Sequence, residues 1–235
     1  MSETKSHTLL VQAAKNGAVD GVRRLHEKIK IPPDDLNEAF IQAATYGQLE
    51  CLDVLKSKID LTIQDRAIGA AAANNHAQCL RYLMNPQPNS NGVYGALPER
   101  GYTLPLLIAA KHGHVECMNV LLPVSDPQYL WLVLNEAAKQ GCVHGVELLL
   151  AQKCIEYTDM ETPLLCAAVY SHLNCVDALY PLADVQKTLE NLNLYYSSCK
   201  NQWRFLEERY YAEQQKIVLN ACIETPSTTT RVSKL

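Results

Sequence analysis

A pair of adjacent alanines returns along the chain at a nearly constant interval, and no other feature of the sequence restricts the fold as strongly. The pair occurs at Ala13-Ala14, Ala43-Ala44, Ala71-Ala72, Ala109-Ala110, Ala137-Ala138 and Ala167-Ala168. Successive first alanines are separated by 30, 28, 38, 28 and 30 residues. Self-similarity at a period of roughly 20 to 50 residues is typical of proteins that stack one small structural unit many times.

The residues after each alanine pair predict a turn and then a second helix. The third residue after the pair is glycine in four of the six units, and it is Asn75 or Ser171 in the other two. Glycine and asparagine tolerate the left-handed conformation that ends a helix. Three further positions, at steps of three residues, are apolar in every unit, and this spacing keeps them on one helix face. Each unit is therefore predicted to be a helix–turn–helix.

These units resemble the repeats of the ankyrin family, and the resemblance covers roughly residues 6–183. Thr162, Pro163 and Leu164 match the start of the family's Thr-Pro-Leu-His signature without its histidine, and residues 101–105 are a second partial copy. Most intervals are shorter than the family's repeat of about 33 residues, which implies short fingers between repeats. We therefore expect an all-α ankyrin-repeat solenoid, with six repeats in residues 1–183 and a C-terminal helical cap or extension.

The 38-residue interval contains an insertion at residues 85–102 that is rich in proline, glycine and asparagine. These residue types favour turns and interrupt helices, so we predict a surface loop. Surface loops tolerate insertions that have no function, and they also supply contacts to partners. Under the second interpretation, Tyr94 and Arg100 are secondary partner-binding residues.

Beyond residue 183 the repeat pattern ends, and residues 184–222 predict a helical extension with helices over 185–196 and 200–222. The second helix carries Trp203, Tyr210 and Tyr211 among many charged residues. A solenoid needs a covered end, because its terminal repeat leaves part of an apolar face open. We favour a cap, and the alternative is a helix that binds a partner through these three aromatic residues.

Residues 223–235 form a tail of small and hydroxylated residues, which is typical of flexible segments. The tail ends in Ser233, Lys234 and Leu235, which match the peroxisomal address and also fit a PDZ-domain ligand. A Ser/Thr-rich tail behind a glutamate-bearing helix also resembles the export signals of type IV-secreted ankyrin effectors of intracellular bacteria. That resemblance implies an effector that acts on a host protein in the host cytosol.

Composition argues against several other classes of protein. The formal net charge is −4 without a long basic run, so nucleic acid is not the expected partner. No window holds about 18 consecutive apolar residues, so no membrane span is expected. The first residues lack the apolar core of a secretory signal. The nine cysteines are an odd number in a chain without such a signal, which indicates a reducing, cytoplasmic environment.

Most cysteines and histidines occupy repeated positions, which favours a structural role over catalysis. One position beside the apolar face of the second helix holds cysteine in four units, namely Cys51, Cys79, Cys117 and Cys175. Cysteine packs there as a small apolar side chain. A second position, in the turn, holds His76, His114, Cys142 and His172. The ankyrin resemblance implies a histidine at that position.

No pattern of a metal site, cofactor site or catalytic site is found. His112 and His114 form a pair without a third metal ligand. We therefore expect no metal, no cofactor and no catalysis by the chain. The alternative is an enzyme whose active site lies in or beside the C-terminal helices, in a cleft lined by His172, Cys199 or Glu207.

The residues that packing does not explain lie at the ends of the first helices. The ankyrin resemblance implies that the two positions after each alanine pair face a concave groove, and a third equivalent position leads into each first helix. The predicted partner-binding residues are Tyr46, Asn74, Lys111, His112, Trp131, Lys139, Gln140 and Tyr170. Their aromatic members belong to residue types that dominate protein interfaces. We expect a monomer that recognises a protein partner through a preorganised face.

Overall fold

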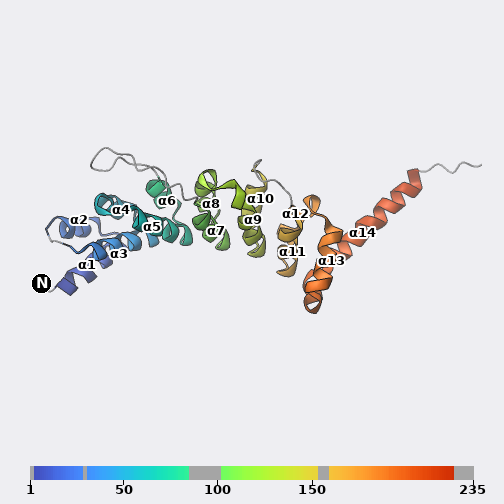
Figure 1. Cartoon of the computed structure of the whole chain (residues 1–235), viewed down its shortest axis with the longest axis horizontal. Coiled ribbons are helices and arrows are strands. Elements are labelled where there is room, and N and C mark those ends of the chain that lie inside the picture. Colours follow the sequence, from blue (N-terminus) through green and yellow to red (C-terminus); the bar gives the residue numbers. More distant parts are fainter. Residues whose placement is uncertain (1–2, 29–30, 85–101, 153–158, 225–235) are drawn as a thin grey trace, which may run out of the picture. The chain divides into compact units, whose positions relative to one another are not determined.

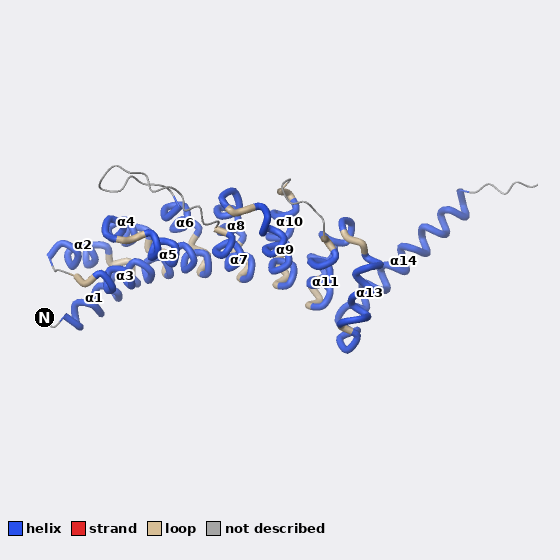
Figure 2. The backbone as a smooth tube through the Cα atoms, viewed as in Figure 1, coloured by secondary structure: helices blue, strands red, loops and turns tan. Residues whose placement is uncertain are grey.

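The computed structural model describes residues 3–28, 31–84, 102–152 and 159–224. All regular elements in these ranges are helices, and no strand occurs among them (Figure 2). The all-α prediction is confirmed for this part of the chain. None of the helices described is both long enough and apolar enough to cross a membrane.

The chain divides into two compact units, Met1–Tyr157 and Thr158–Leu235. The sequence pattern suggested a boundary after residue 183, where the repeats end. The sixth repeat lies in the same compact unit as the C-terminal helices, and its first helix packs against both of them. The boundary after residue 183 stays a prediction about where the repeats end.

The first unit consists of five helix–turn–helix pairs (Figure 1). Their helices are α1 Glu3–Lys15, α2 Val19–Lys28, α3 Pro33–Thr45, α4 Leu49–Leu55, α5 Leu61–Ala73, α6 Ala77–Met84, α7 Thr103–Lys111, α8 Val115–Leu121, α9 Leu130–Lys139 and α10 Val143–Leu150. Short 3-10 turns follow at η1 Lys56–Lys58, η2 Leu122–Val124 and η3 Pro127–Tyr129. Within this unit the first helix of each pair packs against the first helix of the next pair, and the second helices form a parallel row beside them.

The turn between the two helices of each pair has the predicted left-handed residue. All six such residues in the chain have φ between 59° and 72°. Four are glycines, whereas Asn75 and Ser171 adopt the same conformation with a side chain. The same backbone turn is therefore built six times from three different residue types.

The alanine pairs lie in the core of first helices that pack on one another. Both alanines of the pairs in α3, α5, α7 and α9 are completely buried. The second helices bury Leu52, Leu80, Met118 and Val146 at one shared position. Burial of such an apolar side chain contributes about 1.5 to 3 kcal/mol. The repeated apolar positions of the sequence are thus the core, as predicted.

The second unit contains α11 Glu161–Val169, α12 Leu173–Leu179, η4 Tyr180–Leu182, α13 Val185–Tyr195, η5 Ser197–Cys199 and α14 Lys200–Glu224. Helices α13 and α14 pack on α11. Leu192 of α13 and Trp203 and Leu206 of α14 are completely buried. These two helices close an apolar face of the sixth repeat, which is the capping role favoured by the sequence.

An ionic and aromatic cluster holds α14 beside α12. The guanidinium of Arg209 pairs with the carboxylate of Asp177, and its Nε lies 3.3 Å from Oε1 of Glu213. The same guanidinium carbon lies 4.1 Å from the ring centroid of Tyr180. Burial and a hydrogen bond to Glu213 raise the pKa of Tyr180 to about 12.

The three aromatic residues proposed as contacts on α14 have different environments. Trp203 is 0% exposed, and its indole Nε1 donates a hydrogen bond of 3.4 Å to the carbonyl oxygen of Tyr196. It is a core residue and not a surface contact, since the cap places it against the sixth repeat. Tyr210 is half-buried and donates to Oε1 of Gln186, whereas Tyr211 is exposed.

Two of the predicted features lie outside the described residues. The predicted insertion covers residues 85–102. Residues 85–101, with Tyr94 and Arg100, lie outside the described part, whereas Tyr102 is described and is buried. Of the predicted tail, residues 223–224 end α14, whereas residues 225–235 with Ser233, Lys234 and Leu235 lie outside the described part. The roles suggested for these residues stay predictions.

Candidate protein-binding surface

Most of the predicted partner-binding residues lie at the C-terminal ends of the first helices. We call those of the first unit the C-terminal row, which consists of Tyr46, Asn74, Lys111, His112, Lys139 and Gln140. Tyr46, Asn74, His112 and Gln140 are the residues that directly follow α3, α5, α7 and α9. All six except half-buried Lys139 are exposed. Tyr170 follows α11 in the second unit in the same way and is 52% exposed.

Local contacts hold several of these side chains in place. The Nζ of Lys15 lies 4.7 Å from the ring centroid of Tyr46, which remains 43% exposed. Asn74 donates from Nδ2 to the carbonyl oxygen of Ala70 at 2.8 Å. Gln140 donates from Nε2 to Oε1 of Glu136 at 2.9 Å. Side chains that are already ordered lose less entropy when a partner binds.

A series of hydrogen bonds fixes the backbone next to the C-terminal row, and we call it the turn ladder. Gln48 Nε2 donates to the carbonyl oxygen of Lys15 at 3.3 Å. His76 Nε2 lies 3.0 Å from the carbonyl oxygen of Thr45, and His114 Nε2 lies 3.1 Å from that of Ala73. A carbonyl oxygen only accepts, so each Nε2 carries the proton. The two histidines therefore join one repeat to the preceding one and are engaged in structure.

A second group, exposed except for the half-buried Asp65, lies in the N-terminal halves of the first helices, and we call it the entry row. It consists of Asp65, Leu104, Trp131 and Leu132. Trp131 was predicted from the sequence and is 54% exposed. Leu104 is 66% exposed and Leu132 is 37% exposed. These two leucines stand at the same position of neighbouring repeats.

The leucines of the entry row were missed in the sequence, although a signal was present. Their position holds Thr8, Glu38 and Arg66 in the first three repeats of the unit. When a repeated position that is polar and solvent-exposed in some repeats becomes apolar in others, the apolar residues form an exposed patch. The patch is confined to the fourth and fifth repeats.

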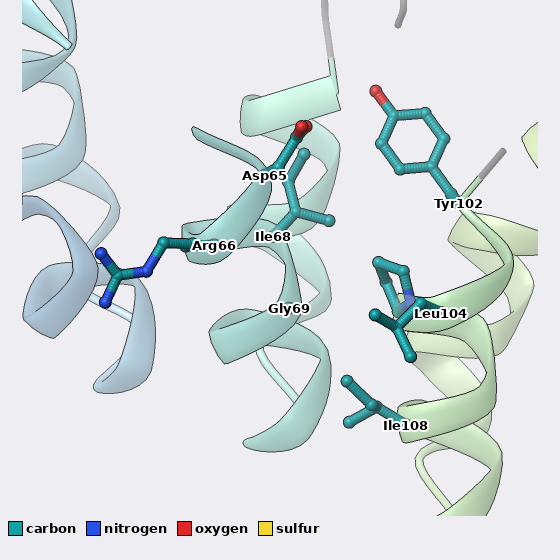
Figure 3. A pocket seen from close by; sticks show the side chains of 8 residues that line it. Asp65, Arg66, Ile68, Gly69, Tyr102, Leu104 and Ile108 are labelled. Atoms are coloured by element: carbon teal, nitrogen blue, oxygen red, sulfur yellow. The ribbon is translucent and has the colours of Figure 1, made fainter. Parts of the chain in front are cut away.

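A cavity of about 410 Å³ lies between α5 and α7, directly beside this patch (Figure 3). Helix α5 lines it with Ile68, Gly69 and Asp65, whereas Leu104, Pro105 and Ile108 line it from α7. Tyr102 precedes α7 and lines the same cavity. Burial and the neighbouring Asp65 carboxylate raise the pKa of Tyr102.

The four cysteines of the shared position are buried, which confirms the packing prediction. Burial raises the pKa of Cys79 and of Cys117 to about 11, and it also raises the pKa of Cys51. These thiols are therefore protonated at neutral pH, whereas the nucleophile in cysteine chemistry is the thiolate.

The residues considered for a metal site or an active site make ordinary stacking, ionic and packing contacts. No group of three or more His, Cys, Asp or Glu side chains suited to a metal ion occurs among the described residues. The His112 ring stacks on that of His114, with centroids 5.6 Å apart. Glu207 pairs with Lys200, whose Nζ lies 3.3 Å from Oε2, and Cys199 is half-buried in η5.

Helix pairs that stack one on the next through buried small residues define a helical-repeat protein. Comparison with known proteins supports a particular family. Residues 106–191 match the family model of Ankyrin repeats (3 copies). No curated protein sequence matches the chain. Together with the fold, this match supports a relationship between the chain and the ankyrin-repeat family.

A solved structure shows the same fold. The crystal structure of the human ASB11 ankyrin repeat domain superposes with a TM-score of 0.53, covering 74% of this chain and 82% of that domain. The sequence identity is 20%, so the likeness concerns the fold alone. The predicted fold class is therefore confirmed from both sequence and structure.

Proposed function

We propose that this protein is a protein-recognition module that binds a partner through the first-helix face of its first unit. This face combines the C-terminal row and the entry row. Ankyrin repeats in general present extended surfaces to other proteins, and the exposed side chains of this face support its assignment as that surface.

The observation that carries the proposal is the exposure of large side chains that contribute little to the core. Tyr46 and Trp131 are about half exposed, and the aliphatic side chain of Leu104 lies mostly in solvent. Tyrosine and tryptophan are enriched among the residues that dominate binding energy. The Lys15 ammonium lies over the Tyr46 ring, which reduces the ordering that this side chain needs on binding.

The proposal also specifies a charge pattern. Lys111 and His112 lie at the end of α7, and Lys139 lies at the end of α9. The C-terminal row therefore carries positive charge beside aromatic groups, while Asp65 carries negative charge in the entry row. A partner surface with acidic residues opposite Lys111 and Lys139 complements this arrangement.

Affinity capture from eukaryotic cell lysate, followed by mass spectrometry, tests the proposal. The wild-type chain is compared with a variant that carries Tyr46→Ala, Lys111→Ala and Trp131→Ala. The matched control carries Glu50→Ala, Gln78→Ala and Glu116→Ala, which are exposed residues at one shared position of the second helices. Circular dichroism and thermal melting establish that both variants are folded.

The expected result is a protein that wild type and control recover and that the first-helix variant loses. A partner retained by the folded first-helix variant would contradict the proposal and would direct attention to α14 or the tail. Loss of the partner from the second-helix control alone would contradict it as well, because binding would then use the opposite side of the unit.

A further inference from the structure

The cavity between α5 and α7 exists because one repeat lacks a side chain. The position of Gly69 is occupied in the other repeats of the first unit by Val11, Ile41, Leu107 and Asn135. A Cβ atom added to Gly69 would have no neighbour within 4 Å. Glycine inside a helix is less stable than alanine, so this glycine weakens α5 without any packing need.

The inner surface of the cavity is mainly apolar. Ile68 is buried at its base, and Leu104, Pro105 and Ile108 form the wall on α7 (Figure 3). Its volume of about 410 Å³ lies in the range of roughly 300 to 1,000 Å³ that is typical of clefts that bury ligand groups. A large apolar side chain of another molecule therefore fits this space.

One acidic side chain, Asp65, lies at the rim. Among the residues that the structure describes, the carboxylate of Asp65 has no ion-pair or hydrogen-bond partner. Arg66 also lines the cavity, but its guanidinium points away from α7 (Figure 3). The carboxylate points towards Tyr102, which is itself buried. A carboxylate at the rim of an apolar cavity is a favourable site for a cationic group, because the pair forms a charge-assisted hydrogen bond.

We propose that this cavity is an anchor site for a peptide segment of the partner, which inserts a large apolar side chain between α5 and α7 and places a lysine or arginine on Asp65. The proposal rests on the function proposed above and adds the chemistry of the partner. The Gly69 gap supplies the space, Leu104 and Ile108 supply the apolar contact, and Asp65 supplies the charge.

A phage-displayed library of random linear peptides, selected on the wild-type chain, tests this inference without knowledge of the natural partner. A synthetic peptide with a selected sequence is then titrated by fluorescence anisotropy. We expect selected sequences that pair leucine, methionine or phenylalanine with a nearby lysine or arginine. Replacement of that basic residue by alanine should weaken binding about tenfold, since a charge-assisted contact is lost.

Two variants of the chain locate the peptide. Gly69→Leu places in the cavity the side chain that Leu107 supplies at the next junction, and it should reduce affinity by more than about tenfold. Asp65→Asn keeps the shape of the site and should weaken binding about tenfold. Gly21→Ala in α2 is the matched control, because its new Cβ would make ordinary contacts at 3.6 Å or more. If Gly69→Leu does not fold, Leu104→Ala replaces it, because it removes part of the apolar wall at an exposed position.

The outcomes separate this inference from the proposed function. Peptides that lose binding with Tyr46→Ala but not with Gly69→Leu would overturn the anchor site and leave the first-helix face intact. Peptides sensitive to Gly69→Leu but indifferent to Asp65→Asn would overturn the basic partner residue. If none of the selected peptides lost affinity with any of these variants, the result would count against both proposals. A wild-type dimer that Gly69→Leu dissociates would show that a second copy fills the cavity, which also overturns the inference.

Discussion

The turn ladder and the entry row belong to the same five repeats of the first unit, yet they differ in how much they vary. At the turns, each repeat uses a left-handed residue, and the second, third and fourth repeats each add a side chain that reaches back to the preceding repeat. In the entry row, the corresponding residues change from polar to apolar and from charged to aromatic. Uniformity marks the contacts that every repeat needs to stack, and variation marks the surface that distinguishes this protein.

The two regions should therefore respond differently to substitution. Changes in the turn ladder should reduce the free energy of unfolding and affect binding only through folding. Changes in the entry row should affect binding and leave the free energy of unfolding nearly unchanged.

The largest effect on stability is expected for Gly47→Ala. Gly47 has a φ of +72°, and a Cβ there would lie 2.5 Å from Nδ1 of His76. The ring cannot move away without loss of its hydrogen bond to Thr45. We expect a loss of about 2 to 4 kcal/mol in the free energy of unfolding, measured by urea denaturation.

Gly113→Ala is the matched control for this prediction. Gly113 has a φ of +69°, but the nearest atom to its new Cβ would be Sγ of Cys142 at 3.8 Å. Only the cost of a left-handed backbone for alanine remains, so we expect a loss of about 1 to 2 kcal/mol in the free energy of unfolding. Equal losses in the two variants would show that the His76 contact has no energetic role.

A smaller loss is expected for His76→Ala. The variant removes the 3.0 Å hydrogen bond to the carbonyl oxygen of Thr45 and leaves that acceptor without its partner from the next repeat. We expect a loss of about 1 to 2 kcal/mol in urea denaturation. His112→Ala changes an exposed histidine of the C-terminal row and serves as the comparison. A similar loss in both would mean that the turn ladder is not a special source of stability.

Gly69→Ala should act in the opposite direction. Its φ is not left-handed and its new Cβ meets no atom, so alanine should stabilise α5. We expect a gain of about 0.5 to 1 kcal/mol in the free energy of unfolding. A destabilised variant would show that the cavity is less open in solution than in the structure.

The smallest effect on stability is expected for Leu104→Ala in the entry row. This side chain is largely exposed, so thermal denaturation should show a change within about 0.5 kcal/mol. Ala109→Leu, at a completely buried alanine of the same helix, is the contrasting variant and should be strongly destabilising. A large loss with Leu104→Ala would remove the distinction between the two regions.

The fold followed from the sequence because its determinants are local and repeated. The alanine pairs, the left-handed turn residues and the apolar steps of three each specify a short segment, and six copies make the pattern unmistakable. The exposure of Tyr46 and Trp131 was predictable for the same reason, since equivalent positions have equivalent environments in stacked repeats.

The features that the sequence did not reveal depend on contacts between distant residues. Tryptophan is a residue type that is common in interfaces, and only the packing of α14 on α11 shows that Trp203 belongs to the core. The cavity at Gly69 needs α7 on its other side, although α7 follows α5 only after the insertion. The division after residue 157 depends on which helices the sixth repeat contacts.

Site-specific photo-crosslinking tests the central claim most directly, because it reports proximity in the intact chain without removing any contact energy. A photoreactive amino acid replaces Tyr46, Trp131, Glu50 or Tyr211 in turn, and each chain is irradiated with the captured partner. The account predicts crosslinks from positions 46 and 131 and none from position 50. Crosslinks from positions 50 or 211, with none from 46 and 131, would contradict the assignment of the first-helix face as the binding surface.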